Sequence, residues 1–133
     1  MELDYLYTDY LFKGDGSLIK NGFIGIDKKG TICEIGVTND SIRNKGKYLE
    51  GGISPAFINV HCHLELSHLK DKVERKTGLV GFIKKLQSIR DADKSNVVKS
   101  MHDADKAMWE EGIAGVGDIS NSEISFKVKA NSK

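Results

Sequence analysis

The chain has 133 residues with 20 basic and 19 acidic side chains, a formal net charge of +1, and two cysteines. This balance offers no electrostatic attraction to nucleic acid or to an anionic membrane surface, so neither partner is expected. Two cysteines make no disulfide framework, no stretch approaches the ~20 apolar residues of a membrane span, and the acidic N-terminus does not resemble a signal peptide, so a cytoplasmic location is expected.

The first 52 residues are predicted to form a β-rich domain. Their β-forming side chains are separated by turns that contain glycine. Gly30 can adopt the positive φ that a hairpin turn requires at its position. Strands are expected over residues 5–12, 22–27, 31–36 and 48–50.

From residue 53 the pattern changes to an alternation of strands and helices, which is typical of a parallel sheet or barrel. Apolar residues at helical spacing predict two helices, and Ser95 is a plausible N-cap of the second, which Gly112 ends. Residues 125–133 show no clear element. Strands are expected over residues 55–60 and 113–120, with a helix over residues 78–90 between them.

The most informative motif is a pair of histidines directly after the first of these strands. His61 and His63 are two positions apart, and alternate residues of a strand point to the same side. Cys62 points the other way and is expected to be a buried packing thiol. Two neutral imidazoles on one side of a rigid strand supply half of a four-ligand metal site. A pair of structural histidines is the alternative.

Residues 55–70, with the sequence PAFINVHCHLELSHLK, carry this pair and resemble the first barrel strand of the amidohydrolase superfamily. They are most similar to the branch that contains ring-amine deaminases and chlorohydrolases. Ala56 and Asp71 stand where that pattern usually or often has glycine. Neither is a predicted ligand, so the two departures concern the subfamily and leave the histidine pair unchanged.

The resemblance implies an α/β fold in two parts. Residues 1–52 would form part of a β-sandwich, and residues 53–133 would begin a (β/α)8 barrel, with its first βα unit and second strand. A closed barrel takes ~200 residues or more, so 133 residues would form only an incomplete one. The chain is therefore expected to be the N-terminal portion of such a protein.

The resemblance also implies metal-dependent hydrolysis of a non-peptide C–N bond in a small molecule, a heterocyclic amine or a cyclic amide. His61 and His63 would hold one divalent ion, Zn²⁺ in the first place and Fe²⁺ or Mn²⁺ as alternatives, and a metal-bound hydroxide would attack the ring. The family's further ligands, two histidines and an aspartate on later strands, have no counterpart after Asp118. No catalytic residue is assigned here, and the chain alone is expected to be inactive.

Three residues are predicted to contact the substrate. Glu65 and His68 follow the histidine pair, and Asp118 ends the second strand, where active sites of such barrels lie. The alternatives are solvated loop residues and, for Asp118, the cap of a turn. Two other functions stay open: one chain of a split enzyme whose remaining barrel is supplied by a second chain, or a non-catalytic β-rich binding module with a vestigial histidine pair. The missing C-terminal part or a homo-oligomer is a possible partner.

Overall fold

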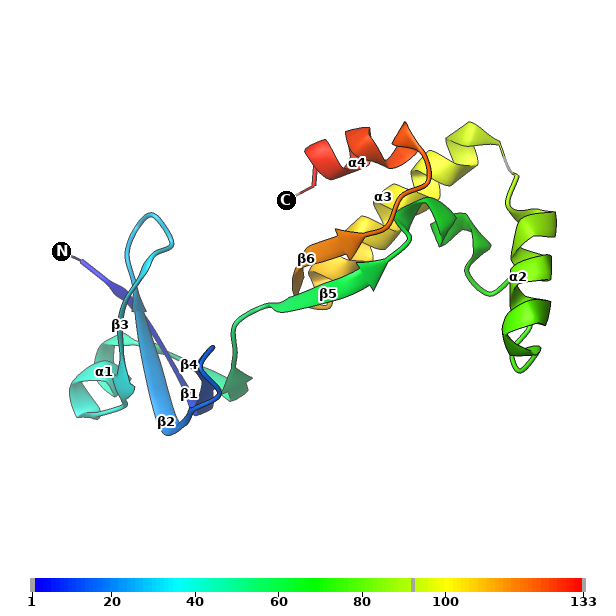
Figure 1. Ribbon diagram of the computed structural model, residues 1–133. Coiled ribbons are helices and arrows are strands. Elements are labelled where there is room, and N and C mark those ends of the chain that lie inside the picture. The colour runs from blue at the N-terminus through cyan, green and yellow to red at the C-terminus, as the bar shows by residue number, and fades with distance from the viewer. Residues whose placement is uncertain (1, 92, 133) are drawn as a thin grey trace. The chain divides into compact units, whose positions relative to one another are not determined.

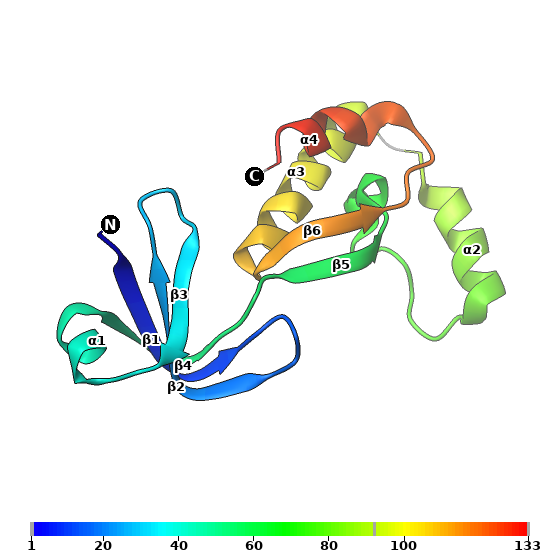
Figure 2. The same cartoon turned by 60° about the vertical axis from the view of Figure 1, so that its left-hand side comes forward.

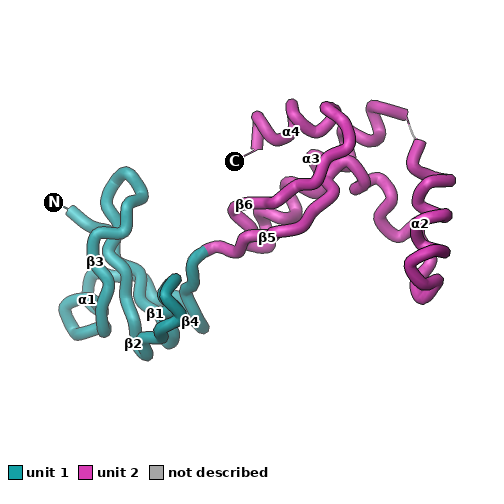
Figure 3. Tube along the Cα trace, viewed as in Figure 1, with its two compact units in different colours: residues 1–55 teal, residues 56–133 magenta. Residues whose placement is uncertain are grey.

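The computed structural model describes residues 2–91 and 93–132. The chain divides into two compact units, residues 1–55 and residues 56–133 (Figure 3). Within the described part of the chain, no helix combines the length and the apolar character that crossing a membrane requires. The two units are described separately below.

The first unit is a four-stranded sheet built from the four predicted strands (Figure 1). The strands are β1 (Asp4–Phe12), β2 (Leu18–Ile26), β3 (Ile32–Val37) and β4 (Lys47–Ile53). Their order is β3-β2-β1-β4, with β1 antiparallel to β2, β2 antiparallel to β3, and β1 parallel to β4. Gly30 has a φ of 83° in the turn between β2 and β3, as predicted.

A short helix that the sequence pattern did not predict, α1 (Asp40–Lys45), lies between β3 and β4. The side chain of Asn39 caps it by accepting a hydrogen bond from the backbone N–H of Ile42 at 3.0 Å. Ile42 is buried, which anchors the helix to its unit. Because parallel strands need a crossover connection, α1 belongs to the segment that brings β4 beside β1.

The second unit contains a two-stranded parallel sheet and several helices, of which α3 packs against β6 and α2 lies away from the sheet (Figures 1 and 2). The strands β5 (Phe57–Cys62) and β6 (Ile113–Asp118) pair in parallel. Between them lie the 3₁₀ helix η1 (Leu64–Leu69), α2 (Gly78–Ile89) and α3 (Lys94–Glu110). The 3₁₀ helix η2 (Glu123–Ser125) and α4 (Phe126–Ala130) follow β6. The predicted order of strand, helices and strand is confirmed.

Two details of the second unit differ from the predictions. The N-cap of α3 is Asp93 and not Ser95, because the Asp93 carboxylate accepts hydrogen bonds from the backbone N–H groups of Ser95 and Asn96. Residues 125–133, which were predicted to lack an element, contain α4 and the last residue of η2. α4 is held by Val128, whose side chain is only 1% exposed.

A compact apolar cluster forms the core of the second unit. Leu64, Val97, Met101 and Val128 are buried in it, and Cys62 packs against it from β5, partly buried as a free thiol. Trp109, near the end of α3, lies outside this core and is 49% exposed. No residue of α2 is buried, so the apolar stripe predicted from its sequence is not covered within the described chain.

The second unit exposes large apolar side chains on β5 and on α2. Val60 is 81% exposed and Leu79 76% exposed. Exposed apolar side chains on a short sheet favour association, so we expect the average mass in sedimentation velocity to rise with protein concentration. Replacing Val60 by Lys is expected to reduce this rise. A monomer at every concentration would contradict the prediction.

Candidate metal site

The two predicted metal ligands lie side by side at the end of β5. His61 belongs to the strand and His63 follows it directly, and their Nε2 atoms are 3.2 Å apart. The ring centroids are separated by 5.2 Å, with the rings tilted by 65°. The i, i+2 spacing therefore places both imidazoles on one side of the chain, as the sequence indicated.

A backbone carbonyl group determines which ring nitrogen of His63 carries the proton. His63 Nδ1 lies 2.9 Å from the carbonyl oxygen of Ile119. A carbonyl oxygen only accepts, so Nδ1 of His63 carries the proton and, in the neutral ring, Nε2 has a free lone pair. His61 Nε2 lies 3.2 Å from His63 Nε2. A ligand histidine whose other nitrogen donates to a backbone carbonyl is the usual arrangement in metal sites.

The pair fits two ligands of one ion. Two nitrogens that each lie ~2.1 Å from a zinc ion at an angle of about 100° are about 3.2 Å apart, which matches the observed separation of 3.2 Å. A catalytic zinc ion normally has three protein ligands. Among residues 2–91 and 93–132, no group of three or more His, Cys, Asp or Glu side chains is arranged to hold a metal ion.

Asp118, at the end of β6, is held by three neighbours. Its Oδ1 accepts a hydrogen bond from the backbone N–H of Leu64 at 2.7 Å, and its Oδ2 accepts one from the Ser120 hydroxyl at 2.8 Å. The Lys129 ammonium lies 2.5 Å from Oδ2. Burial alone would raise the pKa of this carboxyl group, but the Leu64 N–H, Lys129 and Ser120 outweigh it and hold the pKa below its usual value.

Glu65 is a second buried carboxylate, only 4% exposed. Arg90 and Asn121 donate to its Oε1 at 2.9 and 3.0 Å, and Ser122 donates to its Oε2 at 2.8 Å. Burial opposes ionisation, but these hydrogen bonds and the Arg90 charge outweigh it, so the pKa of Glu65 lies below its usual value. Glu65 therefore connects η1 with the end of α2 and with the loop after β6.

His68 is also buried, between two backbone carbonyl groups. Its Nδ1 lies 3.1 Å from the carbonyl oxygen of Glu65, and its Nε2 lies 3.1 Å from that of Arg90. Glu65, His68 and Asp118 thus all have partners within the chain. Their predicted contacts with a substrate stay a prediction, and the structure adds a role for each in holding neighbouring segments together.

The residues that complete these networks were not identified from the sequence. Lys129 was assigned to a structureless tail, and Arg90 was counted only as the end of a helix. The contacts of both with their carboxylates join residues that are distant in the sequence. The one local signal for such a network is Glu65 itself, which lies between two leucines. If this segment is buried, its carboxylate needs a hydrogen-bond or charge partner, because an unpaired buried charge is unfavourable.

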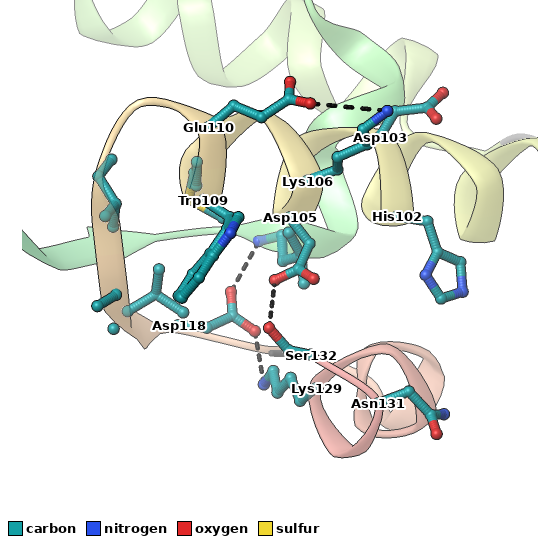
Figure 4. A pocket seen from close by; sticks show the side chains of 16 residues that line it. His102, Asp103, Asp105, Lys106, Trp109, Glu110, Asp118, Lys129, Asn131 and Ser132 are labelled. Carbon is teal, nitrogen blue, oxygen red and sulfur yellow. Dashed lines mark hydrogen bonds and ion pairs between the residues drawn. The ribbon is translucent and has the colours of Figure 1, made fainter. Parts of the chain in front are cut away.

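A cavity in the second unit lies away from the histidine pair. It has a volume of about 660 Å³ and opens between α3, β6 and α4 (Figure 4). Trp109, Lys106 and Asp105 line it on the side of α3, and Asp118 and Lys129 line it on the opposite side. His61 and His63 do not line this cavity.

Comparison with solved structures identifies the fold. No protein-family model matches the sequence, and no curated protein matches it either. The structure is similar to an amidohydrolase from Brucella melitensis, with 17% identity and a TM-score of 0.65, over 88% of this chain and 26% of that one. It is also similar to guanine deaminase from C. acetobutylicum with bound guanine, with 13% identity and a TM-score of 0.65. That match covers 96% of this chain and 32% of the guanine deaminase chain.

Helicobacter pylori aminofutalosine deaminase in complex with methylthio-coformycin has a TM-score of 0.77 and 23% identity. That match covers 97% of this chain and 33% of that one, so the chain spans about a third of the length of this neighbour. At these identities the likeness concerns the fold. The chain has the fold of about a third of these deaminase and amidohydrolase structures, and this fold agrees with the one that the resemblance of residues 55–70 implies.

Proposed function

We propose that this chain supplies part of the metal site of a hydrolase that acts on a non-peptide C–N bond, with a heterocyclic amine as the substrate to be deaminated. The observation that carries this proposal is the geometry of His61 and His63. Their Nε2 atoms are 3.2 Å apart, and His63 is oriented by the Ile119 carbonyl so that its Nε2 lone pair is free. The fold shared with deaminases supports the reaction class.

In this proposal His61 and His63 hold a divalent ion, Zn²⁺ in the first place and Fe²⁺ or Mn²⁺ as alternatives. The ion, when bound, supplies a water of lowered pKa as the nucleophile. The chain's own residues orient this edge of the site. Ile119 fixes the ring of His63, and Glu65 holds the loop after β6 near the ends of the strands, where a substrate would approach.

Two ligands are fewer than a catalytic zinc site normally uses, so we propose that further polypeptide completes the site and that these 133 residues alone do not turn over substrate. The split-enzyme alternative is supported by the exposed apolar side chains of β5, such as Phe57 at 64% and Val60 at 81% exposure. In a barrel, strands at this position are covered by neighbouring elements.

The metal proposal is tested by titrating the purified chain with Zn²⁺ while recording histidine side-chain NMR signals. Saturable but weak Zn²⁺ binding is expected, because only two ligands are present. The NMR signals of the His61 and His63 rings are expected to change their chemical shifts during the titration. A His61→Ala, His63→Ala double variant is expected to lose this binding. His102→Ala is the matched control, because His102 is exposed on α3 and lines a different part of the unit.

Three outcomes would contradict the proposal. Binding that survives the double substitution would place the ion elsewhere, and an absence of any binding would remove the site. Release of ammonia from amino-substituted heterocycles by the chain alone, measured with the double variant as the background, would show that 133 residues are sufficient for turnover.

A further inference from the structure

The end of β6 contacts the residues around His63 through three hydrogen bonds. The Ile119 carbonyl accepts from His63 Nδ1 at 2.9 Å, and the Asp118 carboxylate accepts from the backbone N–H of Leu64 at 2.7 Å. The backbone N–H of Ile119 donates to the Cys62 carbonyl at 2.8 Å. Asp118, the last residue of β6, and Ile119, which follows it, therefore hold the three residues that have His63 at their centre.

We propose that Asp118 is a positioning residue that fixes the orientation and the tautomer of His63. This inference rests on the proposed function, because it matters chemically only if His63 Nε2 serves as a ligand. Asp118 does not contact the His63 ring. It acts through the backbone, by holding the Leu64 amide so that the ring beside it meets the Ile119 carbonyl.

Asp118 is suited to this role because its carboxylate has little freedom to move. The side chain is 3% exposed, and Ser120 and Lys129 hold the oxygen that does not contact Leu64. Lys129 also donates to the Ser120 hydroxyl at 3.0 Å, so the three side chains form a closed triangle. Hydrogen bonds to a charged acceptor are stronger than neutral ones, so the hydrogen bond from the Leu64 N–H to the Asp118 carboxylate is expected to hold the backbone firmly.

Removal of this anchor has a defined chemical consequence. Without the Asp118 acceptor the Leu64 amide loses its partner, and the backbone beside His63 is free to rotate. The ring then no longer has to donate from Nδ1, and the alternative tautomer places a proton on Nε2. A protonated Nε2 has no lone pair for a metal ion, so binding requires that this proton first be moved.

The test compares three variants of the full chain in metal-free NMR spectra that resolve the two ring nitrogens of each histidine. Wild type is expected to show His63 with its proton on Nδ1. Asp118→Ala is expected to shift His63 toward the Nε2–H tautomer, and Asp118→Asn, which keeps the shape and one acceptor oxygen, is expected to give a smaller shift. Asp105→Asn is the control, because Asp105 bonds only Ser132 among the described contacts.

Zn²⁺ titration of the same samples supplies the second measurement. Loss of a residue that orients a ligand typically weakens metal binding by about 10–100-fold, so Asp118→Ala is expected to fall in that range, Asp118→Asn to lie between it and wild type, and Asp105→Asn to match wild type. Amide dispersion reports whether each variant is folded. If Asp118→Ala does not fold, the tautomer and the Zn²⁺ affinity of Asp118→Asn decide whether Asp118 positions His63.

The outcomes separate this inference from the proposed function. A wild-type His63 tautomer and wild-type affinity in the folded Asp118 variants would overturn the positioning role and leave the metal site intact. Failure of wild type to bind Zn²⁺ would overturn the proposed function, and the tautomer comparison would still decide whether Asp118 positions His63.

Discussion

Replacing Leu64 by Ala is expected to lower the free energy of unfolding of the second unit by about 2–5 kcal/mol. Leu64 is 1% exposed and belongs to the cluster with Val97, Met101 and Val128. The substitution removes the side chain and keeps the backbone N–H that bonds Asp118, so it measures packing alone. Urea denaturation followed by the fluorescence of Trp109, the single tryptophan of the chain, reports on this unit.

Leu79→Ala is the matched control for this substitution. The same atoms are removed from a side chain on α2 that is 76% exposed, so we expect a change within about 0.5 kcal/mol. Equal effects of the two substitutions would show that Leu64 is not part of a packed core in solution.

Replacing Glu65 by Gln is expected to lower the free energy of unfolding at neutral pH by about 1–3 kcal/mol, because the charged acceptor of three hydrogen bonds is lost. The effect should depend on pH. The pKa of Glu65 is depressed in the folded state, so its carboxylate stabilises the fold above the unfolded-state pKa of ~4.3 and loses that contribution as the pH falls through the folded-state value. The difference between wild type and variant should therefore shrink below about pH 4.

Glu110→Gln is the control for the charge itself. Glu110 Oε1 lies 3.6 Å from Lys106 Nζ on α3, and the Glu110 side chain is 61% exposed. Solvent therefore screens this ion pair, and the free energy of unfolding is expected to change by less than about 0.5 kcal/mol. Urea denaturation across the acid range, again with Trp109 fluorescence, measures both variants. A difference between wild type and Glu65→Gln that persists unchanged at low pH would contradict the assignment of Glu65 as an ionised acceptor.

Much of the local structure follows from short-range patterns in the sequence. Alternation and glycine turns predicted the strands of the first unit, and helical spacing predicted α2 over almost its full length. The spacing of His61 and His63 predicted their common side, because strand geometry decides it within three residues. These features depend on neighbours in the chain, which the sequence displays directly.

The remaining features depend on contacts between distant residues. α4 is five residues long, too short to show a helical period, and it is held by the burial of Val128 against α3. The networks of Glu65 and Asp118 require Arg90 and Lys129 from other elements, and no local pattern pairs these charges. The exposure of Trp109 also depends on the fold: aromatic side chains are largely buried on average, but this one lies near the end of α3 and is half exposed.

The connection between β5 and β6 also determines when the histidine site can form during folding. The two strands are neighbours in space, yet η1, α2 and α3 all lie between them in the chain. Closing so long a loop costs more conformational entropy than closing the hairpins of the first unit, so this pairing belongs to the late part of folding. His63 obtains its acceptor, the Ile119 carbonyl, only when β6 has docked. If His61 and His63 bind a metal ion as proposed, the site forms only after this long-range pairing is made, and it is lost whenever the pairing opens.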